Sequence, residues 1–146
     1  MRVNARLAVT FCAGVAVGAA VTAEWRLHGT SAEHPCPWAE SLDAVVSAPQ
    51  NHRVLLENDK VRVLDVVVAP GAREPLHAHC WPSVLTVLQG GRARDYDADG
   101  KISDEGNIIP SGKSAPFSFW LQRTPPHSVE NLDSIPIHLI RVEMKP

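Results

Sequence analysis

Residues 61–91 read VRVLDVVVAPGAREPLHAHCWPSVLTVLQGG, and this stretch decides the fold class. It opens on a β-branched run, Val61 to Val68, which ends at a Pro70-Gly71 turn. A second apolar run, Val84 to Leu88, ends at Gly90-Gly91. Short apolar runs between glycine and proline residues are typical of β-strands. The stretch therefore predicts two strands with a connecting segment between them.

The same texture continues on both sides of this stretch, and the sequence predicts about eight to ten short strands in all. The pair Asp99-Gly100 predicts a tight hairpin, and no useful helical periodicity occurs after residue 23. We therefore expect an all-β sandwich or barrel, of which the jelly roll is a common small version. The further expected strands are Val54–Glu57, Ala93–Tyr96, Lys101-Ile102, Pro116–Leu121, Ser128-Val129 and Ile135–Val142.

Length and composition describe an ordinary globular chain. It has 146 residues, about one domain, of which 45% are hydrophobic and 21% charged. Lysine and arginine total 14 against 16 acidic residues, so the formal charge is -2 and nothing resembles a phosphate-binding basic patch. Three cysteines without a C-x-x-C pair exclude a disulfide-dense scaffold and a cysteine-based zinc site. Because the chain has no such basic patch, nucleic acid is not an expected partner.

The N-terminal segment has the layout of a signal peptide. Arg2 and Arg6 precede an uncharged, small-residue-rich run from Leu7 to Ala23. The run closes on Val21-Thr22-Ala23, which favours cleavage after residue 23 and export to the periplasm or the extracellular space. The alternative is an uncleaved anchor in which residues 7–23 hold the protein at a membrane.

Residues 24–51 are expected to form a linker or N-terminal arm, and residues 52–146 the folded domain. The arm contains several prolines and one short apolar stretch, Leu42 to Val46, which we expect to dock on the domain together with Trp38. Cys36 and Cys80 both remain after cleavage. A disulfide between them and two isolated thiols are both open alternatives.

Three histidines carry the chemistry. His77 and His79 are two residues apart, so in a strand both side chains point to one face and can bind one metal ion. A lone H-x-H pair is weak evidence for such a site, but this pair lies in a longer pattern. Gly71, His77, His79, Ser83 and Gly90 are separated by five, one, three and six residues. His127 and Asn131 follow later in PPHSVEN, with three residues between them.

This pattern resembles the two motifs of the cupin superfamily. The segment His79 to Leu85, HCWPSVL, is similar to a group of small single-domain cupins of the type-2 kind. The resemblance covers residues 52–146 and implies a double-stranded β-helix, a jelly-roll barrel, with one metal ion in its mouth. It implies that His77, His79 and His127 bind this ion.

The chain departs from the cupin motifs at two places. Ser83 stands where the first motif usually has a metal-binding glutamate, and Gln122-Arg123-Thr124 stands where the second has P-x-G. Three neutral imidazoles leave a divalent ion with its full positive charge, so we expect an anionic or chelating small-molecule substrate. Three ligands also leave about three open positions on an octahedral ion.

The resemblance favours an iron(II) centre. Cupins with three histidines and no glutamate include iron(II) thiol dioxygenases and diketone-cleaving dioxygenases, so an exported, mononuclear non-haem iron dioxygenase is one expectation. Imidazole binds zinc, nickel and copper as well, and a zinc site would support hydrolysis or lyase chemistry. Two alternatives need no catalysis: a cupin that binds a small ligand or metal, and a metal-free structural barrel. The resemblance also implies pairing of two copies through their sheets.

Other polar residues are weaker candidates. Ser83 could bond a metal-bound water or simply fill the barrel wall, and Tyr96 could orient a substrate anion or be a half-buried strand residue. His138 and Arg141 are three residues apart on one strand, so at most one points into the barrel. His52, near the arm, is assigned no role.

Overall fold

The structure of the protein, a computed structural model, describes residues 36–146. The expected signal or anchor segment, residues 1–23, lies outside the described residues. Within the described range no helix is long and apolar enough to cross a membrane. A 3-10 helix and α1 precede nine strands, as expected for an all-β chain. The elements are 3-10 helix Glu40–Leu42, α1 Ala44–Ser47, β1 His52–Glu57, β2 Val61–Val68, β3 His77–His79, β4 Ser83–Gln89, β5 Arg92–Tyr96, β6 Ile102–Asn107, β7 Phe117–Leu121, β8 Thr124–Asn131 and β9 Ile137–Met144.

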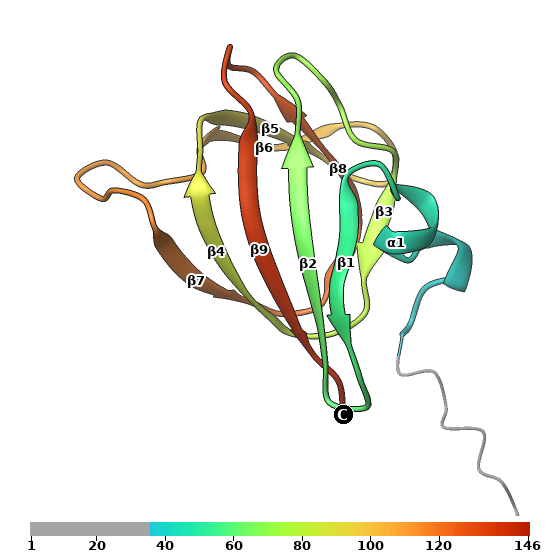
Figure 1. Cartoon of the computed structure of the whole chain (residues 1–146). Coiled ribbons are helices and arrows are strands. Elements are labelled where there is room, and N and C mark those ends of the chain that lie inside the picture. The colour runs from blue at the N-terminus through green and yellow to red at the C-terminus, as the bar shows by residue number, and fades with distance from the viewer. Residues whose placement is uncertain (1–35) are drawn as a thin grey trace, which may run out of the picture. The chain divides into compact units, whose positions relative to one another are not determined.

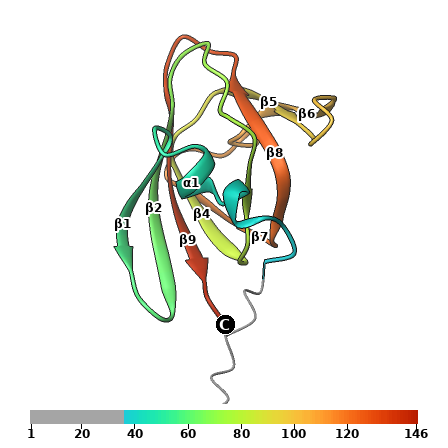
Figure 2. The same ribbon diagram turned by 90° about the vertical axis from the view of Figure 1, so that its right-hand side faces the viewer.

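The strands form two antiparallel sheets that face each other (Figures 1 and 2). One sheet has the order β1-β2-β9-β4-β7 and the other has the order β3-β8-β5-β6. The chain passes from one sheet to the other between β2 and β3, between β3 and β4, and again between β4 and β5. This winding is that of a double-stranded β-helix, so the expected jelly-roll barrel is confirmed.

Alternation along the strands fills the interior with apolar side chains. In β2, Leu64, Val66 and Val68 are buried, and in β9, Ile137 and Leu139 are buried, while their neighbours are mostly more exposed. Leu85 and Ala93 complete the buried cluster from β4 and β5. Because β2 and β9 pair along their whole length, these inward faces lie side by side.

Glycine provides left-handed backbone conformations in several turns. Gly71 and Gly100 have φ values of 68° and 77°, in the left-handed region that side chains with a Cβ rarely adopt. Gly100 lies in the turn between β5 and β6, which pair as antiparallel neighbours. The hairpin predicted from Asp99-Gly100 is therefore confirmed.

Residues 36–51, within the expected linker or N-terminal arm, include a 3-10 helix and α1 and pack on the barrel. Asp43 accepts a hydrogen bond from Val45 N at 3.1 Å at the start of α1, and Ala44 and Ala48 are fully buried. Val45 packs against the core, so the expected docking of this apolar stretch is confirmed. One turn of helix is too short for sequence periodicity to detect.

This segment closes one side of the barrel. Helix α1 contacts both β1 and β3, which are edge strands of the two sheets (Figure 1). Cys36 forms a disulfide with Cys80, the residue after β3, which decides between the two alternatives left open by the sequence. The segment is thus held at one end by a covalent bond and along its length by packing.

Candidate metal centre

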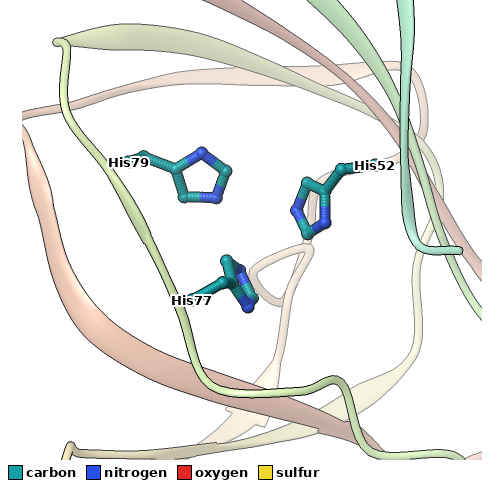
Figure 3. Close-up of side chains that lie close together, drawn as sticks. All are labelled: His52, His77 and His79. Atoms are coloured by element: carbon teal, nitrogen blue, oxygen red, sulfur yellow. The ribbon is translucent and has the colours of Figure 1, made fainter. Parts of the chain in front are cut away.

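Four histidines converge inside the barrel, from three different strands. His52 begins β1, His77 and His79 are the ends of β3, and His127 lies in β8. His77 and His127 are cross-strand partners, and their ring centroids are 4.4 Å apart. The His52 centroid lies 4.6 Å from that of His77 and 5.2 Å from that of His79. Figure 3 shows His52, His77 and His79 facing a common space, and one ring nitrogen from each lies within 4.8 Å of the others.

Backbone carbonyls orient two of these rings in the same way. Nδ1 of His77 lies 2.8 Å from the carbonyl oxygen of Pro75, and Nδ1 of His127 lies 2.9 Å from that of Pro125. A carbonyl oxygen can only accept, so each Nδ1 carries the proton and donates. In a neutral ring the other nitrogen, Nε2, then carries a lone pair. The repeated Pro-x-His sequence therefore holds both rings in the tautomer that can bind a metal ion through Nε2.

The other two rings are held by acceptors of different kinds. Nδ1 of His52 lies 3.2 Å from the carbonyl oxygen of Ala48, and Nδ1 of His79 lies 2.7 Å from Oε1 of Glu143. The second contact is a carboxylate–histidine pair of the kind that orients metal-binding imidazoles. His52, His77 and His79 thus have Nδ1 engaged and Nε2 left for another partner, while His127 is held by backbone groups of both Pro125 and His77.

Burial keeps these imidazoles neutral. It lowers the pKa of His52 to about 3, that of His77 to about 4 and that of His127 to about 3, and the positive charge of Arg141 adds to each effect. Burial, together with Arg141, also lowers the pKa of His79 well below its ordinary value. Only the neutral imidazole has a lone pair for a metal ion, so the donor set suits a cation at neutral pH.

A buried network of charges lies behind His79. Glu143 Oε2 accepts a hydrogen bond from Arg62 Nε at 2.6 Å, while Oε1 faces His79. Arg62 also donates to Asp43 from the segment before β1, at 3.1 Å. All three charged groups are almost completely inaccessible to solvent. The network links the N-terminal segment to the ring of His79 through alternating positive and negative groups.

The histidines line a cavity of about 570 Å³ within the barrel. Arg141 and Glu74 also line it, and both are almost completely buried. Burial raises the pKa of Glu74 to about 8, with Asp95 adding to the effect, so Glu74 is uncharged at neutral pH. Most of the remaining wall is apolar: Val66, Val68, Leu85, Phe119, Leu121, Val129, Ile137 and Leu139.

Sequence comparison alone places the chain in no group. No protein-family model matches the sequence. No curated protein sequence matches it either.

The structure is similar to that of a cupin domain from Bordetella pertussis, with a TM-score of 0.53 and 19% identity over 65% of this chain and 92% of the other. The chain has the cupin fold. A cupin family protein with a double-stranded β-helix from Methanocaldococcus jannaschii gives a TM-score of 0.48 and 14% identity, over 64% of this chain and 78% of that one. A double-stranded β-helix protein from Klebsiella pneumoniae gives a TM-score of 0.47 and 20% identity, over 65% of this chain and 75% of that one.

In this cupin barrel, the three histidines whose ring nitrogens lie within 4.8 Å of one another are His52, His77 and His79. His127, the third histidine expected from the motifs, lies beside His77 but outside this group. Asn131 of the second motif is buried, where it donates to the carbonyl oxygens of Val68 and Ile135. The motif asparagine therefore secures the chain around β8 and β9.

The two weaker candidates lie elsewhere. Ser83 is completely buried, does not line the cavity, and its Oγ has no hydrogen-bond partner among residues 36–146. Tyr96 is half-buried and also lies outside the cavity lining. Its hydroxyl donates to Glu130 at 2.5 Å, and the guanidinium of Arg73 stacks 3.5 Å from its ring centroid. These contacts describe two residues of the barrel wall.

Sequence reasoning missed three residues of the cupin site: His52, Glu74 and Glu143. No spacing motif contains His52, and only the pairing of β1 with β2 brings it beside β3. Glu143 is the cross-strand partner of Ser83, so a carboxylate stands next to the position where the motif glutamate is absent. The sequence feature that could have identified Glu143 is its position two residues after Arg141 in β9, which places both side chains on the inward face.

Proposed function

We propose that this chain is a metal-dependent cupin whose centre is built on His77 and His79. His127 and His52 complete the donor set from β8 and β1. The observation that carries the proposal is the cluster of His52, His77 and His79, in which one ring nitrogen from each lies within 4.8 Å of the others. The Nδ1 atom of each ring is engaged by an acceptor, which leaves Nε2 as the donor. Neutral imidazole donors suit iron, zinc, copper and nickel.

The proposed reaction is oxidation of a small anionic molecule by dioxygen at iron(II). A bound divalent ion would supply Lewis acidity and, as iron(II), the electrons for reaction with dioxygen. The chain's own residues bind and orient: the imidazoles hold the ion, Glu143 fixes His79, and the apolar wall excludes water. The absence of a carboxylate among the proposed donors supports an anionic substrate, because the ion keeps its full charge. The competing function is a cupin that binds a ligand or metal without catalysis.

Metal analysis tests the centre. The protein is purified without chelators, and its metal content is measured by plasma mass spectrometry. We expect about one equivalent per chain, lost when His77 and His79 are both changed to alanine. The single variants His52→Ala and His127→Ala show which flanking ring is required. His138→Ala is the matched control, because His138 lies 2.7 Å from Asp65 and outside the cavity lining.

The metal content separates the chemical alternatives. Iron would lead to an oxygen-electrode screen with small thiols and diketones, in which turnover supports the enzyme. Saturable binding with the ligand recovered unchanged supports the binding module. Zinc, copper or nickel in place of iron would support the metal centre and contradict the proposed oxidation at iron(II). A protein that holds no metal after reconstitution with each of these ions would overturn the proposal.

We also propose that the chain is exported. The arginine-flanked apolar segment before residue 24 supports this, and the disulfide between Cys36 and Cys80 is of a kind that persists in oxidising compartments. Intact-mass measurement on protein from a cell fractionation provides the test. We expect a soluble exported chain that begins at Glu24. A full-length chain in the membrane fraction would support the anchor instead, and a full-length cytoplasmic chain would contradict export.

A further inference from the structure

Arg141 is a buried cation inside the barrel. It lies on the inward face of β9, after Ile137 and Leu139, and 3% of its surface is exposed. It lines the cavity that contains the histidines. Placing a guanidinium in an apolar interior costs several kcal/mol unless a partner compensates, so its partners are informative.

The partners of Arg141 within the protein are incomplete. One terminal nitrogen donates to Thr124 Oγ1 at 2.8 Å. Nε lies 3.8 Å from Glu143 Oε1 and has no hydrogen-bond partner among the described residues. Glu143 is already engaged by Arg62 and His79, at 2.6 and 2.7 Å. A buried cation that lines the cavity therefore keeps donor capacity that no described residue uses.

The carboxyl groups on the cavity wall do not form ion pairs with Arg141 in the described part of the chain. Asp95 and Asp104 belong to β5 and β6, in the other sheet, where they are cross-strand partners. Glu74 is buried and forms no ion pair with Arg141 at 4 Å or less. An anion in the cavity would therefore have Arg141 as its oppositely charged side chain.

The rest of the wall indicates what the anion is attached to. Leu85, Phe119, Leu121 and Leu139 line the cavity from strands of the same sheet as Arg141. A volume of about 570 Å³ falls within the range of pockets that enclose small organic molecules. Apolar walls with a few fixed polar groups are typical of such pockets.

We propose that the cavity binds a small carboxylate with an apolar body, and that Arg141 recognises the carboxylate. The guanidinium donates to the carboxylate oxygens, and the apolar part packs against Leu85, Phe119 and Leu139. This inference rests on the proposed function in one respect, because the ligand occupies the cavity that holds the proposed metal centre. Recognition by Arg141 itself requires no metal ion.

The test compares an anion with its neutral isostere. Hexanoate and hexanamide are titrated into the full chain by isothermal titration calorimetry, once with zinc and once after chelation. We expect hexanoate to bind at least tenfold more tightly than hexanamide in both states. Arg141→Met should weaken hexanoate binding at least tenfold and leave hexanamide binding within a few-fold. Arg53→Met, which removes an exposed arginine of β1 outside the cavity, should change neither value.

Arg141→Lys keeps the charge and loses the planar fork, so its hexanoate affinity should lie between those of wild type and Arg141→Met. If Arg141→Met fails to fold, this variant and the hexanoate–hexanamide comparison on the wild type decide the question. Equal affinity for the two ligands, no hexanoate binding, or unchanged binding by a folded Arg141→Met variant would overturn the inference.

Metal uptake by the same protein separates the two proposals. A chain that takes up metal on reconstitution but does not discriminate hexanoate from hexanamide refutes the carboxylate site alone. A chain that takes up none of the tested metals but discriminates the two ligands through Arg141 refutes the metal centre alone.

Discussion

Glu143 decides which nitrogen of His79 carries the proton. Its Oε1 lies 2.7 Å from Nδ1 of His79 and its Oε2 accepts from Arg62 at 2.6 Å. Both oxygens are therefore used as acceptors. An amide at this position can accept with only one of its two ends.

We expect Glu143→Gln to weaken metal binding by about 10- to 100-fold, the usual effect of losing a partner that orients a metal-binding histidine. The neutral amide loses the ion pair with Arg62 in either orientation. With its NH2 group toward His79 it donates and favours the tautomer with the proton on Nε2, and with its NH2 group toward Arg62 it places two donors face to face. Competition with a chromophoric chelator for zinc measures the affinity.

Glu57→Gln is the matched control for this prediction. Glu57 is exposed on β1, where it pairs with Lys145, and it is not among the residues that line the cavity. It should leave the zinc affinity unchanged. A folded Glu143→Gln variant with wild-type zinc affinity would show that the tautomer of His79 does not depend on Glu143.

Motif spacing identified the residues of the site that lie close together in the sequence or in a repeated pattern. His77, His79 and His127 belong to such patterns. His52 and Glu143 reach the site only through strand pairing, β1 with β2 and β9 with β4, which spacing along the chain does not encode. Strand alternation predicted that at most one of His138 and Arg141 points into the barrel. In the structure Arg141 lines the cavity and His138 does not.

Among the elements, the segment before β1 depends on two different kinds of attachment. The disulfide joins Cys36 to Cys80 across 44 residues, and Asp43 joins the buried charge network through Arg62. The first attachment is covalent and restricts the unfolded chain, whereas the second acts only in the folded state.

We expect removal of the disulfide by Cys36→Ser and Cys80→Ser together to lower the free energy of unfolding by about 4 kcal/mol, from the chain entropy of a loop of this length. Urea unfolding in the absence of reductant measures the difference. Adding reductant should lower the stability of the wild type and leave the double variant unchanged. Equal stability of wild type and double variant would indicate that folded-state contacts compensate for the lost cross-link.

Some strand positions were predictable because glycine, proline and β-branched residues mark them locally. Strands β6 and β8 were expected only at Lys101-Ile102 and Ser128-Val129, because their mostly polar residues form no β-branched run. The range Val61–Val68 is the same in sequence and structure, and β4 differs from its expected range by one residue at each end. Helix α1 was missed because four residues provide no periodicity, and its position depends on a contact with both sheet edges.

For the whole molecule, the buried histidines make the metal-free fold sensitive to acid. The pKa of His52 is lowered to about 3 and that of His77 to about 4, both from 6.5 in an unperturbed chain. Between these values the unfolded chain binds more protons than the folded one. The contribution of both groups is therefore complete above pH 6.5 and is lost as the pH falls toward 4.

The titration of Glu74 changes the stability in the opposite direction. Its pKa is raised to about 8 from 4.5, so the folded chain holds more protons in this range and stability falls as the pH rises through it. The two effects together place maximal stability of the metal-free protein near neutral or slightly acidic pH.

Urea unfolding in chelating buffer between pH 4 and 8 tests this dependence. Each buried imidazole contributes a slope of up to about 1.4 kcal/mol per pH unit below pH 6.5. His52→Gln should reduce the slope. A free energy of unfolding that is constant from pH 4 to 6.5 would contradict the prediction.

The order of the strands bears on how a newly made chain would acquire its ion. The proposed donors lie in β1, β3 and β8, but the group that orients His79 lies in β9, the last strand. A nascent chain that has not yet released its C-terminus would present His77 and His79 without Glu143 or Arg141. Tight binding of the metal ion would then begin only after β9 has been synthesised and has joined the barrel.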